Sequence, residues 1–518
     1  MKKQIKWFWA HRRNASLHHM SFFGAGLRGR GFVPVCDFYF DHQIYYGVPG
    51  KGCYIFYDHN QLSQADLYRR VQTSVDHNIK FIEEFRSISD KLFGAVFFYL
   101  DKISESNLDL LSDQEISLLY NGFISAVTAG PILTVQLWGI EALLQPEYII
   151  IKHLKKKLKQ WGKEDELQSY KEKLLINTGE SVAYSEQRDF FRVAAGLFHN
   201  KKVFRIFKTH SLQQIARELS NYPRENRWIE AHINKYSWVN SEYVSGAWSK
   251  QDWLKLFKES LQNPTPPTKK LSKLIGDFNS AARARQQLIK KLKPSTDVRH
   301  AIECLSEFIA QRDWSKGYFA KSLLIYRRLL AEIAWRLGET EESILNYHFE
   351  ELGQAMINKI ALPKKIIALR KNQGFIILNK SGSRRIVQGA ANITRTLKQE
   401  GIEDPTKRIN NKDWKIRGLI ANKGKITGRA KVLENSNEID SFKKGEILVT
   451  YMTTMEFTPV FRKAAAVITD EGGMSSHAAI VSREFSLPCI VGTKTATRLI
   501  KSGDLINVDA IKGVITKL

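Results

Sequence analysis

The segment TDEGGMSSHAAIVSREFSLPCIVG (469–492) restricts the fold of this chain more than any other stretch of its sequence. The apolar run AAAVI leads into Thr469 and Asp470, and Gly472 and Gly473 follow almost at once. Glycine allows the backbone to turn sharply and leaves room for another group to approach it closely. This order predicts a buried strand that ends in a tight, open turn.

The residues after this turn predict a helix that carries a histidine in its first turn. Ser475 or Ser476 is placed to cap the helix, and His477 follows directly. An anion at a helix start meets unpaired backbone N–H groups and the positive end of the helix dipole. Because imidazole is a nucleophile near neutral pH, this position suits a histidine that becomes phosphorylated. The spacing alone is equally compatible with a capping-region histidine that has no chemical role.

The C-terminal part of the chain, 416–518, alternates short apolar runs with helix patterns, which predicts a compact α/β domain. Glycines precede several of the apolar runs, as expected where a turn leads into a strand. The expected strands span 424–434, 445–451 and 488–493, the expected helices span 459–464, 476–485 and 493–500, and a closing hairpin spans 504–518.

The same segment resembles the phosphohistidine signature of the phosphoenolpyruvate-utilising enzymes, the group that holds phosphoenolpyruvate synthase, pyruvate phosphate dikinase and rifampicin phosphotransferase. Its matching residues are Thr469, Asp470, Gly472, Gly473, Ser475, Ser476, His477, Ala478, Ala479, Arg483, Glu484, Pro488 and Gly492, preceded by Gly418, Gly424, Gly428, Thr453, Thr454 and Pro459. The resemblance covers 416–518 without a gap. It implies a swivelling phosphohistidine domain, the mobile domain of these enzymes, in which His477 carries a phosphoryl group.

The resemblance implies a loop around this phosphoryl group, formed by Gly472, Gly473, Ser475 and Ser476. Dikinases use the position of Ser475 for regulatory phosphorylation, but helix capping explains a serine there more simply.

Three further residues are candidates for supporting roles, namely Thr469, Asp470 and Arg483. Arg483 follows His477 by six residues rather than three or four, so it is expected beside the helix end rather than over the phosphoryl group. A structural pairing of Arg483 with Glu484 or Asp470 is the simpler interpretation.

The remaining sequence predicts a multidomain α+β protein with a mainly α-helical body. Residues 1–61 read as a mixed β segment, since the runs 33–40 and 53–58 are rich in aromatic and β-branched residues. Apolar residues recur at helical spacing through 62–351, the expected body. A basic connector, 352–415, contains a hairpin at 374–389, a helix at 391–401 and a polar hinge candidate at 403–415.

The helical body resembles the central part of stand-alone members of the same group. His232, Tyr236 and Trp238 match an H-x-x-x-Y-x-W segment there. By analogy with rifampicin phosphotransferase, the body would bind a small-molecule acceptor and His232 would assist its hydroxyl as a base. Core packing of these aromatic residues is the simpler interpretation.

The expected phosphoryl donor is a separate protein. We find no Gly-rich phosphate loop of an ATP-grasp domain in the sequence, and the chain ends directly after the carrier, where synthase and dikinase continue into a phosphoenolpyruvate-binding barrel. The resemblance therefore implies an ATP-grasp partner that uses ATP and Mg²⁺, while the chain itself binds no cofactor. His11, His18 and His19 lie close in sequence without a completing carboxylate or cysteine, so we expect no metal site.

The net charge of +26 is compatible with attraction to polyanions such as nucleic acid, but solvated helix faces are the simpler interpretation because no nucleic-acid-binding motif accompanies the charge. From Gly418 onward there are 14 Lys and Arg against 10 Asp and Glu, so most of the excess positive charge lies in the earlier residues.

The apolar run 126–144 is interrupted by polar residues, which argues against a membrane segment, and we expect a cytoplasmic protein. The alternative to a phosphotransferase is a non-catalytic basic scaffold or regulatory protein that retains the carrier fold.

Overall fold

The computed structural model describes residues 7–13, 16–21, 42–49, 51–58, 81–129, 145–175, 181–239, 248–380, 383–409, 414–453, 457–473 and 476–518. The chain divides into two compact units. Unit 1 comprises Met1–Tyr46 and Ile55–Gly389, and unit 2 comprises Gly47–Tyr54 and Ala390–Leu518. The expected strand at 33–40 and the expected helical stretch 62–80 lie outside the described residues.

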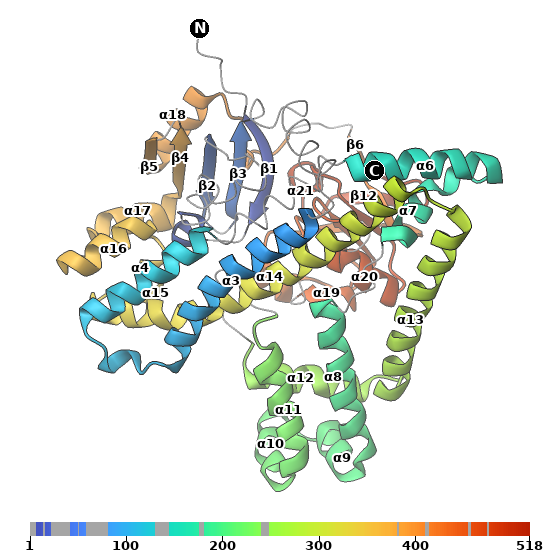
Figure 1. Ribbon diagram of the computed structural model, residues 1–518, viewed down its shortest axis with the longest axis horizontal. Coiled ribbons are helices and arrows are strands. Elements are labelled where there is room, and N and C mark those ends of the chain that lie inside the picture. Colours follow the sequence, from blue (N-terminus) through green and yellow to red (C-terminus); the bar gives the residue numbers. More distant parts are fainter. Residues whose placement is uncertain are drawn as a thin grey trace. The chain divides into compact units, whose positions relative to one another are not determined.

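A five-stranded sheet joins the two ends of unit 1 (Figure 1). Its order is β1-β3-β2-β4-β5. The strands are β1 (Trp7–Arg13), β2 (Gln43–Val48), β3 (Gly52–Asp58), β4 (Phe375–Lys380) and β5 (Ser383–Gln388). The hairpin expected at 374–389 is confirmed as antiparallel β4 and β5. It is an integral part of a sheet with the N-terminal strands, rather than an isolated element of a connector.

Long helices form the main body of unit 1, with α3 running along α14 (Figure 1). They are α3 (Phe81–Glu105), α4 (Asp113–Ala129), α14 (Thr296–Arg336), α15 (Glu341–Ile344), α16 (Phe349–Asn358) and α17 (Lys364–Gln373). Their apolar faces share one core, in which the rings of Phe123 and Tyr326 stack 4.3 Å apart. Burial of these faces, more than helix propensity, holds such helices together.

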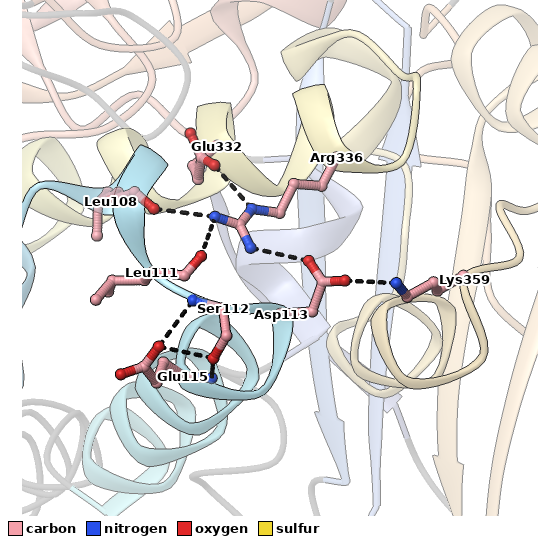
Figure 2. Close-up of polar contacts among 8 residues, drawn as sticks. All are labelled: Leu108, Leu111, Ser112, Asp113, Glu115, Glu332, Arg336 and Lys359. Carbon is pink, nitrogen blue, oxygen red and sulfur yellow. Dashed lines mark hydrogen bonds and ion pairs between the residues drawn. The ribbon is translucent and has the colours of Figure 1, made fainter.

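Arg336, at the end of α14, ties three elements of this body together (Figure 2). Its guanidinium bonds Asp113 at 2.8 Å and Glu332 at 2.7 Å. It also donates to two carbonyl oxygens of the turn before α4, at 3.0 and 2.7 Å. Lys359, beyond α16, bonds the second oxygen of Asp113 at 2.6 Å. These bonds use the planar donor fork of arginine almost completely.

A second group of helices in unit 1 surrounds its own core, which contains Trp253, Phe257 and Phe207. The group consists of α8 (Val182–His199), α9 (Lys201–Thr209), α10 (Leu212–Glu218), α11 (Pro223–Tyr236) and α12 (Lys250–Gln262). The remaining helices are α6 (Gln145–Trp161), α7 (Leu167–Leu175) and α13 (Pro267–Leu292). The proline-rich stretch after α12 ends one helix, and Pro267 begins the next, where a missing N–H costs nothing.

Unit 2 is built on an eight-stranded sheet of order β6-β13-β12-β8-β9-β10-β11-β7. The strands are β6 (Lys415–Arg417), β7 (Leu419–Asn422), β8 (Lys425–Leu433), β9 (Ile447–Thr450), β10 (Ala466–Thr469), β11 (Cys489–Val491), β12 (Leu505–Asp509) and β13 (Val514–Lys517). The central strands β8 to β11 are parallel, and the outer pairings are antiparallel. The expected strands and closing hairpin of the C-terminal domain are thereby confirmed.

The central strands β9, β10 and β11 are buried on both faces of the sheet, and their successive side chains point into opposite cores. Ile468 of β10 belongs to one core, and Val467 belongs to the other. The helices of unit 2 are α18 (Ala390–Glu400), α19 (Thr458–Phe461), α20 (His477–Glu484) and α21 (Ala496–Leu499). Residues of α19 and α20 join the Val467 core, whereas residues of α21 join the Ile468 core.

The first half of the hinge candidate, 403–409, is bonded within unit 2. Ile409 N donates to Arg498 O at 3.1 Å, and Arg408 donates to Ile500 O at 3.1 Å. The chain instead crosses between the units after Tyr46, after Tyr54 and after Gly389, whose φ is 87°. The multidomain α+β fold class is confirmed, and no helix of the described residues is long and apolar enough to cross a membrane.

Candidate functional site

His477 lies just beyond the carboxyl end of the parallel strand β10, where the chain turns into α20. The backbone leaves the sheet gradually, since Asp470 N still donates to Thr450 O at 3.1 Å and Glu471 N to Tyr451 O at 2.8 Å. Gly472 then adopts φ 125°, which side-chain-bearing residues rarely tolerate. A Cβ on Gly472 would lie 2.9 Å from Ser476 Oγ, whereas a Cβ on Gly473 would meet open space. The turn therefore needs glycine at 472, and it leaves the backbone accessible at 473.

The start of α20 is capped by Ser476, which accepts a hydrogen bond from Ala479 N. His477 is consequently the first residue of the helix. The N–H groups of a first turn have no acceptor inside the helix, so those of His477 and Ala478 point toward whatever approaches its start. The predicted capped helix with a histidine in its first turn is confirmed, while the alternative cap, Ser475, lies outside the described residues.

Two side chains from other elements hold the imidazole of His477. Oγ1 of Thr453, three residues after β9, lies 3.0 Å from Nδ1. Phe461 of α19 contacts the ring edge-to-face, with ring centres 5.7 Å apart and an interplanar angle of 88°. Contact on one side and a hydrogen bond at Nδ1 fix the ring plane, which leaves Nε2 as the nitrogen available for bonding to a substrate.

Burial lowers the pKa of His477 from 6.5 to about 4. The imidazole is therefore neutral at physiological pH, with a lone pair on one nitrogen. When Nδ1–H donates to Thr453 Oγ1, that lone pair is on Nε2. A neutral, oriented imidazole at a helix start is the form that a nitrogen nucleophile requires.

Asp470 points away from His477 and organises the neighbouring turn. Its carboxylate accepts bonds from Thr493 Oγ1 at 2.7 Å, from Ala496 N at 2.5 Å, and from both N and Oγ1 of Thr497. Burial raises the pKa of Asp470, and these hydrogen bonds oppose that effect. The geometry therefore supports a structural role in capping α21.

Thr469 and Arg483 likewise lie off the imidazole. Thr469 is fully buried at the end of β10, and its Oγ1 has no hydrogen-bond partner among the described residues. Arg483 Nε donates to Ala421 O of β7 at 3.1 Å. This bond ties α20 to the sheet edge and supports a structural role for Arg483, whereas its expected pairing with Glu484 or Asp470 stays a prediction.

Sequence reasoning did not assign Thr453 and Phe461 to the site. Thr453 was noted only as part of the stretch that precedes the signature. Both residues precede His477 in the chain, and the parallel order β9-β10 brings the ends of their elements together. The one available signal was that a hydroxyl residue, Thr453, follows an apolar strand next to the strand that leads to His477. The ends of neighbouring parallel strands frequently carry functional groups.

Two of the expected acceptor residues, His232 and Tyr236, lie on α11 and are buried against the core of this helix group, whereas Trp238 lies just beyond α11 and is half-buried. His232 is 4% exposed, and its Nε2 lies 3.3 Å from Glu186 Oε1 without forming a regular hydrogen bond. Tyr236 donates to Asp189 at 2.7 Å, and Trp238 Nε1 donates to a backbone carbonyl at 2.8 Å. The geometry supports the core interpretation for His232 and Tyr236, whereas Trp238 lies outside that core.

Comparisons with known proteins agree on the C-terminal region. The family described as "PEP-utilising enzyme, mobile domain" matches residues 442–513, which include His477. The phosphoenolpyruvate synthase of Pyrococcus furiosus is 44% identical over 122 residues, 24% of this chain and 15% of its own length. The probable phosphoenolpyruvate synthase of Staphylothermus marinus is 53% identical over 102 residues, 19% of this chain and 12% of its own.

One similarity extends further along the chain. The rifampicin phosphotransferase of Bacillus subtilis is 30% identical over 247 residues, which is 45% of this chain and 27% of that protein. The chain thus matches between 12% and 27% of the length of these three relatives. The resemblance noted in the sequence is confirmed for the mobile domain.

Proposed function

From the premise that residues 442–513 are a mobile domain of the phosphoenolpyruvate-utilising enzymes, we propose that this chain is a phosphotransferase component whose phosphoryl carrier is His477. The proposal rests on the position, the hydrogen bond and the protonation state of the His477 imidazole. The His477 imidazole begins α20, is bonded at Nδ1 by Thr453, and stays neutral because burial lowers its pKa to about 4.

In the charging step, the lone pair of Nε2 forms a bond to the phosphorus of the donor. The bond between that phosphorus and the leaving oxygen breaks, and its electron pair stays on the oxygen. The capped start of α20 offers two unpaired N–H groups and a positive dipole end to the phosphoryl oxygens. Gly473, whose missing side chain leaves open space, lets the donor approach.

In the delivery step, an acceptor hydroxyl forms the new oxygen–phosphorus bond. The nitrogen–phosphorus bond breaks, its electron pair returns to Nε2, and the hydroxyl proton passes to a base or to solvent. We propose a small-molecule acceptor held by the helices of unit 1. The packing of His232 in a core assigns that residue no part in this step.

We propose further that the donor is ATP bound with Mg²⁺ on a separate nucleotide-binding protein of the ATP-grasp type, so that the histidine takes the β-phosphoryl group. Attack at the β-phosphorus would release AMP and leave a pyrophosphoryl group on Nε2, and a water molecule would then attack the terminal phosphorus, so that phosphate leaves and the β-phosphoryl group stays on the histidine. One histidine that visits two sites needs a rigid-body movement of its domain. Because 403–409 is bonded within unit 2, the proposed pivots are the crossings between the units after Tyr46, Tyr54 and Gly389.

The test is phosphorylation of the full chain with β-labelled ATP and the candidate partner, and in parallel with labelled phosphoenolpyruvate. The expected product is an acid-labile, alkali-stable label that is lost in His477→Ala. His199→Ala, which removes a histidine of α8 in unit 1, serves as the matched control and should label normally. Absence of label with both donors, or a label that survives His477→Ala, would refute the proposed function.

A further inference from the structure

Helix α6 presents a row of lysines that the phosphotransferase proposal does not use. Lys152, Lys155, Lys156 and Lys159 are all exposed and follow the spacing i, i+3, i+4, i+7 of one helix face. On the opposite face, Ile150, Leu154 and Leu158 are each 0% exposed. The packing of the apolar face fixes which way the helix is turned, so the four ammonium groups are held on a common outer surface.

Within the described residues, no carboxylate neutralises these lysines. By contrast, Lys163 just beyond the helix is paired with Glu166 at 2.8 Å. Favourable interaction with the helix dipole explains lysines in a last turn only, and Lys152 lies in the middle of α6.

The end of α13 adds more positive charge beside this row. Lys291 Nζ lies 4.4 Å from the ring centre of Trp161, the last residue of α6. His153 Nε2 contacts Leu292 O at 3.3 Å, so the C-terminal end of α13 meets α6. Lys290, Lys291 and Lys293 are exposed there. Like charges gathered on neighbouring helices repel one another, which raises the benefit of a bound polyanion.

One exposed aromatic residue lies in the same row. Tyr148 is 61% exposed and precedes Lys152 by four residues, so it continues the row toward the helix start. An acidic protein partner would ordinarily bury an apolar patch at the centre of its interface. Among the described α6 side chains, Tyr148 is the one exposed large apolar group, which makes a protein or a lipid surface a poor match.

We propose that the outer face of α6 binds single-stranded nucleic acid, with its phosphates held by Lys152, Lys155, Lys156 and Lys159 and with Tyr148 stacked on a base. From Lys152 to Lys159 the helix rises about 10 Å, enough to meet more than one phosphate. A single strand exposes the faces of its bases to an aromatic ring, whereas a duplex does not. This binding activity goes beyond the proposed phosphoryl transfer and does not require His477.

The test is fluorescence anisotropy of the full chain with a fluorescein-labelled oligouridylate of about 20 nucleotides, over about 50–200 mM salt. Replacement of the four lysines of the row by glutamine should weaken binding at least about tenfold and lower the salt slope by about two to three. Replacement of the same four lysines by arginine should keep the affinity, and Tyr148→Ala should weaken binding about fivefold to a hundredfold. Thermal unfolding of each variant confirms that it is folded.

The matched control removes the same charge elsewhere in unit 1. Lys102, Lys255, Lys321 and Lys364 are exposed lysines of four different helices, and their replacement by glutamine should leave binding nearly unchanged. An equal loss of oligouridylate affinity in this control would show that only the net charge matters and would refute the proposed binding site on α6. No binding by the unaltered chain, or equal competition by polyglutamate or by vesicles of phosphatidylserine, would also overturn it.

Discussion

Oγ1 of Thr453 lies 3.0 Å from Nδ1 of His477, so a hydroxyl that follows β9 orients a ring at the start of α20. The two residues are 24 positions apart in the chain and meet because β9 and β10 are parallel neighbours. The hydrogen bond at Nδ1 orients the ring plane. When Nδ1–H donates to Thr453 Oγ1, the lone pair lies on Nε2, the nitrogen that the proposed transfer uses.

Thr453→Val should slow phosphorylation of His477 about fivefold to tenfold, because it removes a hydrogen bond worth about 1 kcal/mol while keeping the shape of the side chain. Thr453→Ser keeps the hydroxyl and should restore most of the rate. The measurement is the initial rate of label incorporation under a fixed donor concentration. Equal rates in the valine and serine variants would mean that the hydroxyl has no part in orienting the ring.

The rate of labelling should be independent of pH from about 8 down to about 5 and should then fall with a midpoint near 4. Burial lowers the pKa of His477 from 6.5 to about 4, so the nucleophilic neutral form persists well below the ordinary range of histidine. As the pH falls, the His477 side chain is therefore protonated at a higher pH in the unfolded chain than in the folded chain. The contribution of His477 to stability is full above pH 6.5 and is lost as the pH falls toward 4.

Initial labelling rates across this range check the pKa, with His477→Ala as the background. A midpoint near 6.5 would show that the imidazole is solvated in the active form, contrary to its half-buried position.

The elements of unit 2 were predictable from the sequence because each rests on a local pattern. The run AAAVI, buried on both sides in β10, and the Ser-His pair that starts α20 are examples. Such patterns report on near neighbours in the chain. They do not report which distant element a side chain will meet, and this is why Thr453 and Phe461 were not recognised as site residues.

The sheet of unit 1 shows the same limitation on a larger scale. The β4–β5 hairpin was visible in the sequence, but its pairing beside β2 joins segments more than three hundred residues apart in the chain. Asp470 presents a related case, because its position suggested a role beside His477 whereas its four hydrogen bonds all go to residues 493–497. Proximity in sequence to a reactive residue does not decide where a side chain points.

Gly472→Ala should destabilise unit 2 by about 1–3 kcal/mol, because φ at this position is 125° and the new Cβ would lie 2.9 Å from the capping oxygen of Ser476. Gly473→Ala is the matched control, since its Cβ meets open space and should change stability by less than about 0.5 kcal/mol. Urea unfolding of both variants measures the difference. If Gly473→Ala nevertheless lowers the labelling rate, the open space at 473 is where the donor approaches; equal stability losses would contradict the assigned turn.

Arg336→Met should destabilise unit 1 by about 2–4 kcal/mol, because it leaves Asp113, Glu332 and two backbone carbonyls without the guanidinium that bonds them (Figure 2). Its side chain is only 16% exposed, so water cannot fully replace these bonds. Arg327→Met is the matched control from the same helix, since its pair with Glu341 is 44% and 42% exposed and should contribute less than about 1 kcal/mol. The denaturant midpoints of the two variants, each compared with that of the unaltered chain, measure the two losses of stability. A loss in Arg336→Met no larger than in Arg327→Met would show that the network at the end of α14 adds little to the junction of α4, α14 and α16.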